Sequence, residues 1–153
     1  MMQERTIKQY KLAVARHFNR AASQYTQAAF LEKEIGQRLI RRLDLIRQDP
    51  TFILDLGSGT GIHSKSLAQH YPRATLLNLD LAENMLKHPP AFQTSQEIPI
   101  CGDAEFLPFA DNSIDFIFSN CVFHWIQDLT QLFREIHRVL KPEGLLLFSS
   151  LGP

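Results

Sequence analysis

The sequence has few of the features that mark exported or membrane-bound proteins. Its two cysteines, Cys101 and Cys121, are too few for a disulfide framework, so we expect reduced thiols and a cytoplasmic location. No apolar run approaches the roughly 20 residues that span a bilayer, and we predict no membrane partner. The N-terminal segment MMQERTIKQYK lacks the apolar core of a signal peptide, so we expect the mature protein to begin there.

A net charge is also lacking, since 16 Lys and Arg residues balance 16 Asp and Glu residues. The charges are nevertheless separated along the chain. Residues 1–48 hold ten basic and four acidic side chains, a balance of +6, and residues 49–153 hold six and twelve, a balance of −6. A solvated basic helical face that pairs with the acidic remainder would explain this, and so would a docking face for an acidic partner. With no net charge and no basic segments interleaved with aromatic residues, nucleic acid is not an expected partner.

At 153 residues, with 44% hydrophobic and 21% charged residues, the chain has the length and composition of one folded domain. Hydrophobic spacing divides it into a helical N-terminal arm, residues 1–48, and an α/β body, residues 49–153. In the arm, helical spacing continues from Leu31 to Ile46. The preceding segment HFNRAASQY, residues 17–25, predicts a break with exposed aromatic side chains.

The body alternates short apolar runs with helical segments. We expect strands, each bounded by Gly, Pro, Asp or Asn, at residues 51–56, 74–79, 98–101, 114–119 and 144–150. Helices are expected at residues 61–70, at 82–88, and from the N-cap Asp128 to a stop at 142–144. Strands that are apolar on both faces and alternate with helices predict a parallel sheet covered on both sides, so the fold class is α/β, doubly wound.

The segment ILDLGSGTGIHS, residues 53–64, follows the first expected strand and has three interpretations. A triphosphate-binding loop requires Gly-Lys-Ser/Thr at the start of the helix, but Ile62 follows Gly61. A dinucleotide fingerprint starting at Gly57 requires a third glycine at the position of Ile62. The third interpretation starts from Asp55, the acid two residues before the first glycine.

Asp55 falls at the carboxyl end of its strand, in the crevice where open α/β sheets bind ligands. Its carboxylate would repel a pyrophosphate but suit an ammonium group, while the helix start near Gly61 would favour a carboxylate. Asp80 lies 23 residues after Gly57, near the spacing at which an acid accepts hydrogen bonds from ribose hydroxyls. A ligand with a ribose, an amino-acid end and no pyrophosphate is S-adenosylmethionine, which we predict as the cofactor.

Four stretches in order resemble the class I S-adenosylmethionine-dependent methyltransferases: DLGSGTG from Asp55, LDLAENML from Leu79, GDAEFLPF from Gly102 and FIFSN from Phe116. The resemblance implies a Rossmann-like, mainly parallel sheet of about five strands in the order 3-2-1-4-5 behind the helical arm. It also implies which residues bind each part of the cofactor. These are Asp55, Gly57, Ser58, Gly59 and Gly61 at the methionine end, Asp80 at the ribose, Leu81 and Met85 at the adenine, Asp103 and Ala104 at the adenine amino group, Asn120 with Ser119 near the methyl group, and Tyr25 as a cap. No metal site is expected.

One branch of this family, the malonyl-acyl-carrier-protein O-methyltransferases of biotin synthesis, is similar to ARHFNRAASQY, residues 15–25, and to the Asn-x-x-x-His-Trp stretch that follows. This resemblance implies a malonyl carboxylate as acceptor and an acidic acyl carrier protein as partner. It implies the substrate residues Phe18, Arg20, His124 and Trp125, which packing and solvation would also explain. An anionic carboxylate needs no general base, so no catalytic residue is assigned with certainty. His124 is the candidate base, or else a partly buried structural histidine.

The chain departs from this family at its end, because family members usually continue beyond the fifth strand and complete the acceptor pocket there. We therefore expect low or absent turnover. The exposed last strand, residues 144–150, would pair with another copy as a homodimer, unless the chain is a truncated product. A methyltransferase for another small acceptor and a non-catalytic cofactor-binding or interaction module remain the alternatives, and a nicotinamide enzyme is the weakest.

Overall fold

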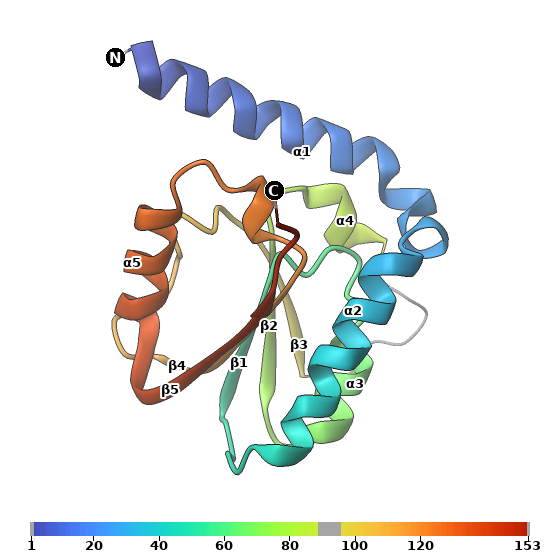
Figure 1. Cartoon of the computed structure of the whole chain (residues 1–153), viewed down its shortest axis with the longest axis vertical. Coiled ribbons are helices and arrows are strands. Elements are labelled where there is room, and N and C mark those ends of the chain that lie inside the picture. The colour runs from blue at the N-terminus through green and yellow to red at the C-terminus, as the bar shows by residue number, and fades with distance from the viewer. Residues whose placement is uncertain (1, 89–95, 153) are drawn as a thin grey trace.

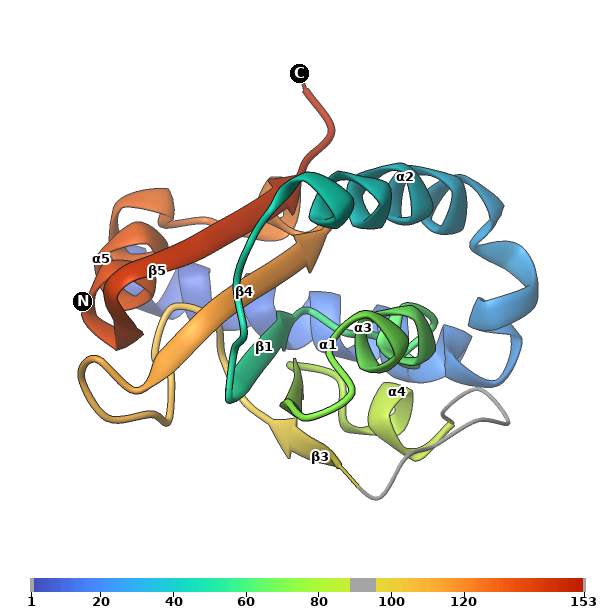
Figure 2. The ribbon, with the colours of Figure 1, turned by 90° about the horizontal axis from the view of Figure 1, so that it is seen from below.

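The computed structural model describes residues 2–88 and 96–152. Within these residues, five parallel strands form one sheet in the order β3-β2-β1-β4-β5, with helices on both faces (Figure 1, Figure 2). The strands are β1 Phe52–Leu56, β2 Thr75–Asp80, β3 Glu97–Cys101, β4 Ile114–Asn120 and β5 Leu140–Ser149. The predicted fold class and strand order are therefore confirmed.

The helices largely follow the predicted pattern. They are α1 Met2–Ala28, α2 Phe30–Arg41, η1 Arg42–Leu45, α3 Ser64–His70, α4 Glu83–Lys87, η2 Phe123–Trp125 and α5 Leu129–Val139. The predicted N-cap of α5 is confirmed, because the Asp128 side chain accepts a hydrogen bond from the Gln131 N–H at 2.9 Å. Among the helices described, none combines the length and the apolar character that crossing a membrane requires.

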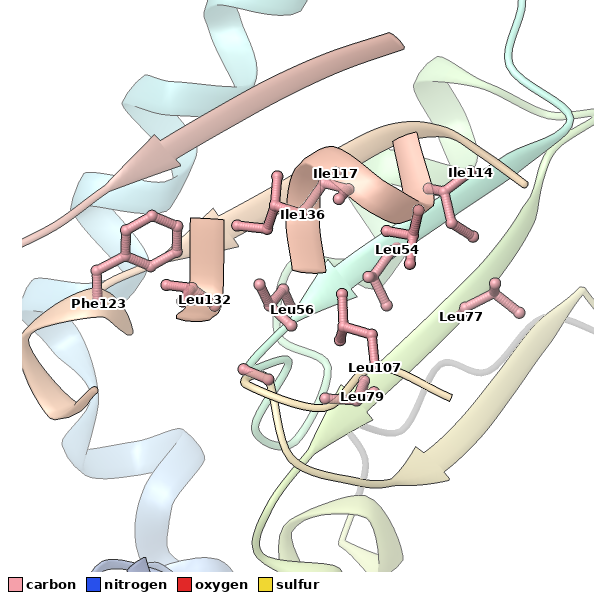
Figure 3. Close-up of a cluster of buried hydrophobic side chains, with 12 residues drawn as sticks. Leu54, Leu56, Leu77, Leu79, Leu107, Ile114, Ile117, Phe123, Leu132 and Ile136 are labelled. Carbon is pink, nitrogen blue, oxygen red and sulfur yellow. The ribbon is translucent and has the colours of Figure 1, made fainter. Parts of the chain in front are cut away.

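Alternate residues of β1 fill two hydrophobic clusters on opposite faces of the sheet. Leu54 is fully buried in the cluster that includes Leu132 and Ile136 of α5 (Figure 3). Ile53 is fully buried in the other cluster, together with Leu39 of α2 and other residues of the arm and α3. This alternation, which follows from the two-residue period of a strand, is what covers the sheet on both sides. The last turns of the predicted arm thus pack into the body of the protein.

The break predicted at residues 17–25 is wrong, because α1 runs through this segment without interruption. Phe18 and Tyr25 are two helical turns apart, so they share one face of α1 and pack on a cluster that includes Met85 of α4. Both aromatic side chains are half-buried rather than exposed. The chain breaks instead at Ala29, whose backbone is not helical (φ −79°, ψ 50°).

The last strand begins earlier than predicted. The Pro142–Gly144 segment does not separate α5 from β5, because the helix ends at Val139 and the next residue, Leu140, already pairs with Ile114 of β4. The register of this pairing then shifts before Phe116, so the predicted stop segment forms an irregularity within the strand.

Candidate functional site

A cavity of about 330 Å³ is lined by residues of α1 and by residues at the carboxyl ends of the strands. Figure 1 shows how α1 runs past this edge of the sheet. Small-molecule sites have volumes of roughly 300–1,000 Å³. The cavity lies where the strand order reverses between β1 and β4, the position at which open α/β sheets bind ligands. The predicted site residues that line it are Phe18, Tyr25, Gly57, Gly59, Asp80, Leu81, Met85, Asp103, Ala104, Asn120, His124 and Trp125. Those that lie outside its lining are Arg20, Asp55, Ser58, Gly61 and Ser119.

The glycine loop after β1 brings bare backbone to the cavity. Gly57, Gly59 and Gly61 have φ angles of 73°, 57° and 72°, in the left-handed region that favours glycine. A Cβ atom on Gly57 would lie 2.3 Å from a methyl carbon of Val122, so there is no room for a side chain. The Gly57 N–H donates a hydrogen bond to the Leu79 carbonyl at 2.8 Å, which joins the loop to the end of β2.

Asp80 is the last residue of β2 and lines the cavity, where it hydrogen-bonds to the backbone of the glycine loop. Its Oδ2 accepts a hydrogen bond from the Gly59 N–H and its Oδ1 one from the Ala82 N–H, both at 2.8 Å. Burial raises the pKa of the Asp80 carboxyl, and these backbone hydrogen bonds oppose that rise. Leu81 and Met85 follow Asp80 along the same wall, and Met85 is buried.

Asp55, in contrast, is sealed inside the protein. Its side chain is 2% exposed, and its Oδ2 has no hydrogen-bond partner among the described residues. Burial, and then the charges of Asp80 and Glu97, raise the pKa of the Asp55 carboxyl to about 8. The Ser58 hydroxyl is likewise buried without a partner in the part of the chain described. Asp55 is therefore a protonated, neutral group at pH 7 rather than an accessible anion.

The sequence prediction missed a lysine at the Asp103 side of the cavity. Lys11 of α1 donates to Asp103 Oδ2 at 2.7 Å and also to Glu105, whose side chain is 3% exposed. Burial lowers the pKa of Lys11, but the hydrogen bonds to the two carboxylates outweigh it and raise the pKa. Lys11, Phe18 and Tyr25 are each seven residues apart and line the cavity together. That spacing would have revealed Lys11, had α1 been predicted as one helix.

Asn120, at the end of β4, connects three segments. Its Nδ2 donates to the Glu32 carbonyl of α2 at 2.8 Å, and its Oδ1 accepts from the Ser149 hydroxyl of β5 at 2.7 Å. The neighbouring Ser119 does not reach the cavity, because it is fully buried and donates to the Leu56 carbonyl at 2.8 Å. Asn120 thus fixes α2 against the strand ends.

His124 and Trp125 come from η2 and face α1. The Trp125 ring packs edge-on against Phe18, with ring centroids 5.2 Å apart at 81°. Burial lowers the pKa of His124, and the charge of Glu32 opposes this. The lowered pKa favours the neutral imidazole, which is the form that a general base requires. Arg20 is exposed on α1.

Carboxylates dominate the charge of the cavity. The Lys, Arg, Asp and Glu side chains among its lining residues are Lys11, Glu32, Asp80, Asp103 and Glu105. One cation against four acids favours a ligand that carries positive charge. Within residues 2–88 and 96–152, no group of three or more His, Cys, Asp or Glu side chains could hold a metal ion.

The family model described as "Methyltransferase domain" matches residues 54–148, which include the glycine loop, Asp80, Asp103 and Asn120. The chain belongs to this methyltransferase family. S-adenosylmethionine is the methyl donor typical of the family, so the predicted resemblance to class I S-adenosylmethionine-dependent methyltransferases is confirmed. The roles of individual residues in this methyltransferase domain remain predictions.

Curated relatives of the methyltransferase domain carry more specific names. A malonyl-[acyl-carrier protein] O-methyltransferase of Gallionella capsiferriformans is 42% identical over 151 residues, which cover 94% of this chain and 52% of the relative. The protein of the same name from Methylovorus sp. is 44% identical over 94% of this chain and 51% of its own length. The biotin biosynthesis bifunctional protein BioHC of Cellvibrio japonicus is 42% identical over 94% of this chain and 28% of its length. The chain spans about half the length of the malonyl-[acyl-carrier protein] O-methyltransferases that it matches.

Solved structures share the fold of the methyltransferase domain. A chain of the Haloferax volcanii complex between the Trm112 methyltransferase activator and a candidate methyltransferase superposes with a TM-score of 0.77. It is 23% identical over 87% of this chain and 59% of that chain, a likeness of fold alone. A phosphoethanolamine N-methyltransferase of Haemonchus contortus, in complex with S-adenosylhomocysteine, has a TM-score of 0.65 and 26% identity, over 73% of this chain and 27% of its own.

Proposed function

We propose that this methyltransferase domain binds S-adenosylmethionine in the cavity and serves to methylate the free carboxylate of a malonyl-acyl carrier protein. The observation that carries the proposal is the cavity itself, in which four carboxylates and one lysine surround bare glycine backbone. S-adenosylmethionine supplies an electrophilic methyl group and presents sulfonium and ammonium cations. The residues fit this group, because Gly59 lines the cavity without a side chain, and a Cβ there would be in van der Waals contact with Met85 and Tyr25 at 3.4 and 3.5 Å and would fill space at the cavity wall.

The polar groups of the cavity wall suit the nucleoside end of this ligand. Asp80 keeps lone pairs beyond its two backbone hydrogen bonds, and these would accept the ribose hydroxyls. Leu81 and Met85 offer apolar contacts for the adenine ring. Asp103, with Ala104 beside it, would accept a hydrogen bond from the adenine amino group, and Lys11 fixes the orientation of that carboxylate.

The remaining residues would position the two reactants. Methyl transfer from a sulfonium is an in-line displacement, in which correct alignment supplies much of the rate. Asn120, Tyr25, Phe18 and Trp125 bound the part of the cavity where the methyl group would lie. An anionic acceptor carboxylate requires no general base. The neutral imidazole of His124 favours a second candidate, an acceptor that must lose a proton.

The outer face of α1 supports an acidic protein as the carrier of the acceptor. Between Arg5 and Leu31 the chain has five Lys or Arg residues and no acidic residue. Of these, Arg5, Lys8, Arg16 and Arg20 are exposed. Acyl carrier proteins are acidic, so such a face would attract them.

We expect Asp80→Ala to weaken S-adenosylhomocysteine binding at least tenfold, since the loss of even one hydrogen bond to a charged acceptor costs about 1.5–3 kcal/mol. Isothermal titration of the wild type, Asp80→Ala and Asp49→Ala measures this. Asp49 is a matched control, because it is exposed and paired only with the exposed Arg73 among the described residues. Equal affinity in all three proteins would refute the assignment of Asp80.

A methyl-transfer assay with labelled donor tests the acceptor. We expect label on malonyl-acyl carrier protein and none on acetyl-acyl carrier protein, which has no free carboxylate. The Lys8→Glu/Arg16→Glu variant should bind the malonyl carrier protein about tenfold more weakly and S-adenosylhomocysteine normally, because reversal of exposed charges acts on the partner alone. Binding of S-adenosylhomocysteine without transfer to any acceptor would instead identify a non-catalytic cofactor-binding module.

Three further predictions remain part of the proposal. A cytoplasmic location follows from a role in biotin synthesis.

The division at residue 48 into arm and body is kept as a description of the sequence, although Leu39 and Leu43 pack with the body. A homodimer through β5 is supported by the position of this strand at the edge of the described sheet and by the exposure of Phe148.

A further inference from the structure

Three of the four carboxylates that line the cavity already have partners. Asp80 accepts two backbone hydrogen bonds, and Asp103 and Glu105 share Lys11. The fourth carboxylate belongs to Glu32, on α2. Its side chain makes no hydrogen bond or ion pair with any residue in the described part of the chain. An anion without a counter-charge at a cavity wall is a group to which a cationic ligand can bind without first displacing a partner.

The position of Glu32 is fixed by the sheet. Its backbone carbonyl accepts the hydrogen bond from Asn120 Nδ2 at 2.8 Å, and Asn120 is the last residue of β4. Glu32 therefore lies beside the point where the strand order reverses, next to the glycine loop that follows β1. Its negative charge is felt across the cavity, because it adds to burial in raising the pKa of Tyr25 to about 12.

Asp55 is poorly placed for the role that its sequence position suggests. It lies outside the cavity lining and is 2% exposed, so an ammonium group could reach it only if the loop moved. Burial keeps the Asp55 carboxyl protonated at neutral pH, because its pKa is raised to about 8. A neutral, enclosed carboxyl offers no charge to a cation in the cavity.

We propose that Glu32, and not Asp55, is the carboxylate that binds the α-ammonium group at the amino-acid end of the methyl donor. This inference rests on the proposed function, because it assigns a residue within the same cavity. In this arrangement α2 supplies the counter-charge, and Asn120 holds α2 in place through its hydrogen bond to the Glu32 carbonyl.

The test compares two ligands that differ at the amino-acid end. S-adenosylhomocysteine carries the ammonium group, and 5′-methylthioadenosine lacks the whole amino-acid end but keeps the nucleoside. Glu32→Gln should weaken binding of S-adenosylhomocysteine about tenfold and leave the affinity for 5′-methylthioadenosine within twofold of the wild type. Glu34→Gln is the matched control, since Glu34 lies one half-turn away on the same helix, pairs with Arg38, and does not line the cavity.

Further variants keep the outcomes distinct. Glu32→Asp retains the charge on a shorter side chain, and it should lose less affinity than Glu32→Gln even if the latter folds poorly. Unchanged binding of S-adenosylhomocysteine by Glu32→Gln would overturn the inference, and so would an equal loss for both ligands. A selective loss of S-adenosylhomocysteine in Asp55→Asn that exceeds the loss in Glu32→Gln would return the role to Asp55. If the wild type binds neither ligand, the proposed function itself fails.

Discussion

Replacement of Gly57 by alanine is expected to lower the affinity for S-adenosylhomocysteine by about 100-fold. The φ angle of 73° places this residue in the left-handed region, which costs a residue with a Cβ about 1–2 kcal/mol. The new Cβ would also lie 2.3 Å from Val122, and overpacking of this kind costs about 1–3 kcal/mol. The loop would relax into another conformation, and binding would have to restore the original one. Isothermal titration of the folded variant measures the loss.

Two companion variants separate the causes of this loss. Gly152→Ala is the control for glycine replacement in general, because nothing lies within 4 Å of a Cβ added there. Val122→Ala in the Gly57→Ala background removes the steric clash but leaves the backbone strain, so it should restore only part of the affinity. Binding by Gly57→Ala within twofold of the wild type would show that the loop does not hold the ligand.

The second large effect concerns pH. The pKa of Asp55 is raised to about 8 in the folded protein, from an ordinary value of 3.8. The folded state therefore keeps a proton that the unfolded state has lost, and stability must fall as the pH rises from about 4 to about 8. Between pH 6.5 and pH 8 the expected loss is about 1.6 kcal/mol, because the slope of about 1.36 kcal/mol per pH unit falls to half as the pH reaches the folded pKa. Asp55→Asn, which is neutral at every pH, should remove most of this loss.

The denaturation experiment must not go below pH 6.5 because of His63. Burial lowers the pKa of His63 to about 4, against the backbone hydrogen bond to Glu32, which raises it. The contribution of His63 to the free energy of unfolding is complete above its ordinary pKa of 6.5 and is lost as the pH falls through 4. Its pH dependence is therefore opposite to that of Asp55, whose contribution is lost as the pH rises. Urea denaturation at pH 6.5, 7.3 and 8 compares the wild type with Asp55→Asn, and Asp49→Asn is the exposed control. A wild type as stable at pH 8 as at pH 6.5 would contradict the raised pKa.

The fold could be predicted from the sequence because its signals are local. Short apolar runs between turn residues indicated the five strands, and Asp128 marked the start of α5. The break expected at residues 17–25 was wrong because polar residues interrupt the apolar pattern there, although Phe18, Ala22 and Tyr25 recur at helical spacing and face the body. This spacing can be recognised only when Phe18 and Tyr25 are known to pack on the same cluster. That packing is a tertiary contact with Met85 of α4, which the local sequence does not reveal.

The site could be predicted in part for a similar reason. Residues at strand ends, such as Asp80 and Asn120, lie in the cavity because parallel strands bring their carboxyl ends to one edge. Lys11 and Glu32 come from helices outside the sheet, so their place in the cavity depends on how α1 and α2 pack. For Lys11, the seven-residue spacing to Phe18 and Tyr25 is a signal only when α1 is known to be one helix. Asp55 occupies a strand end as well, but its side chain is enclosed and lies outside the cavity lining. A sequence pattern carries no information on that enclosure.

The separation of basic and acidic residues along the chain affects how the protein meets a charged partner at a distance. The protein has no net charge, yet the exposed bases of α1 lie on one side of a cavity that is lined by acids. Such a molecule has a substantial electric dipole moment. An acidic macromolecule would therefore be oriented before contact, with α1 turned towards it, although its overall attraction from afar is weak. Orientation of this kind fades with added salt as the Debye length shortens from about 10 Å at 0.1 M to about 3 Å at 1 M.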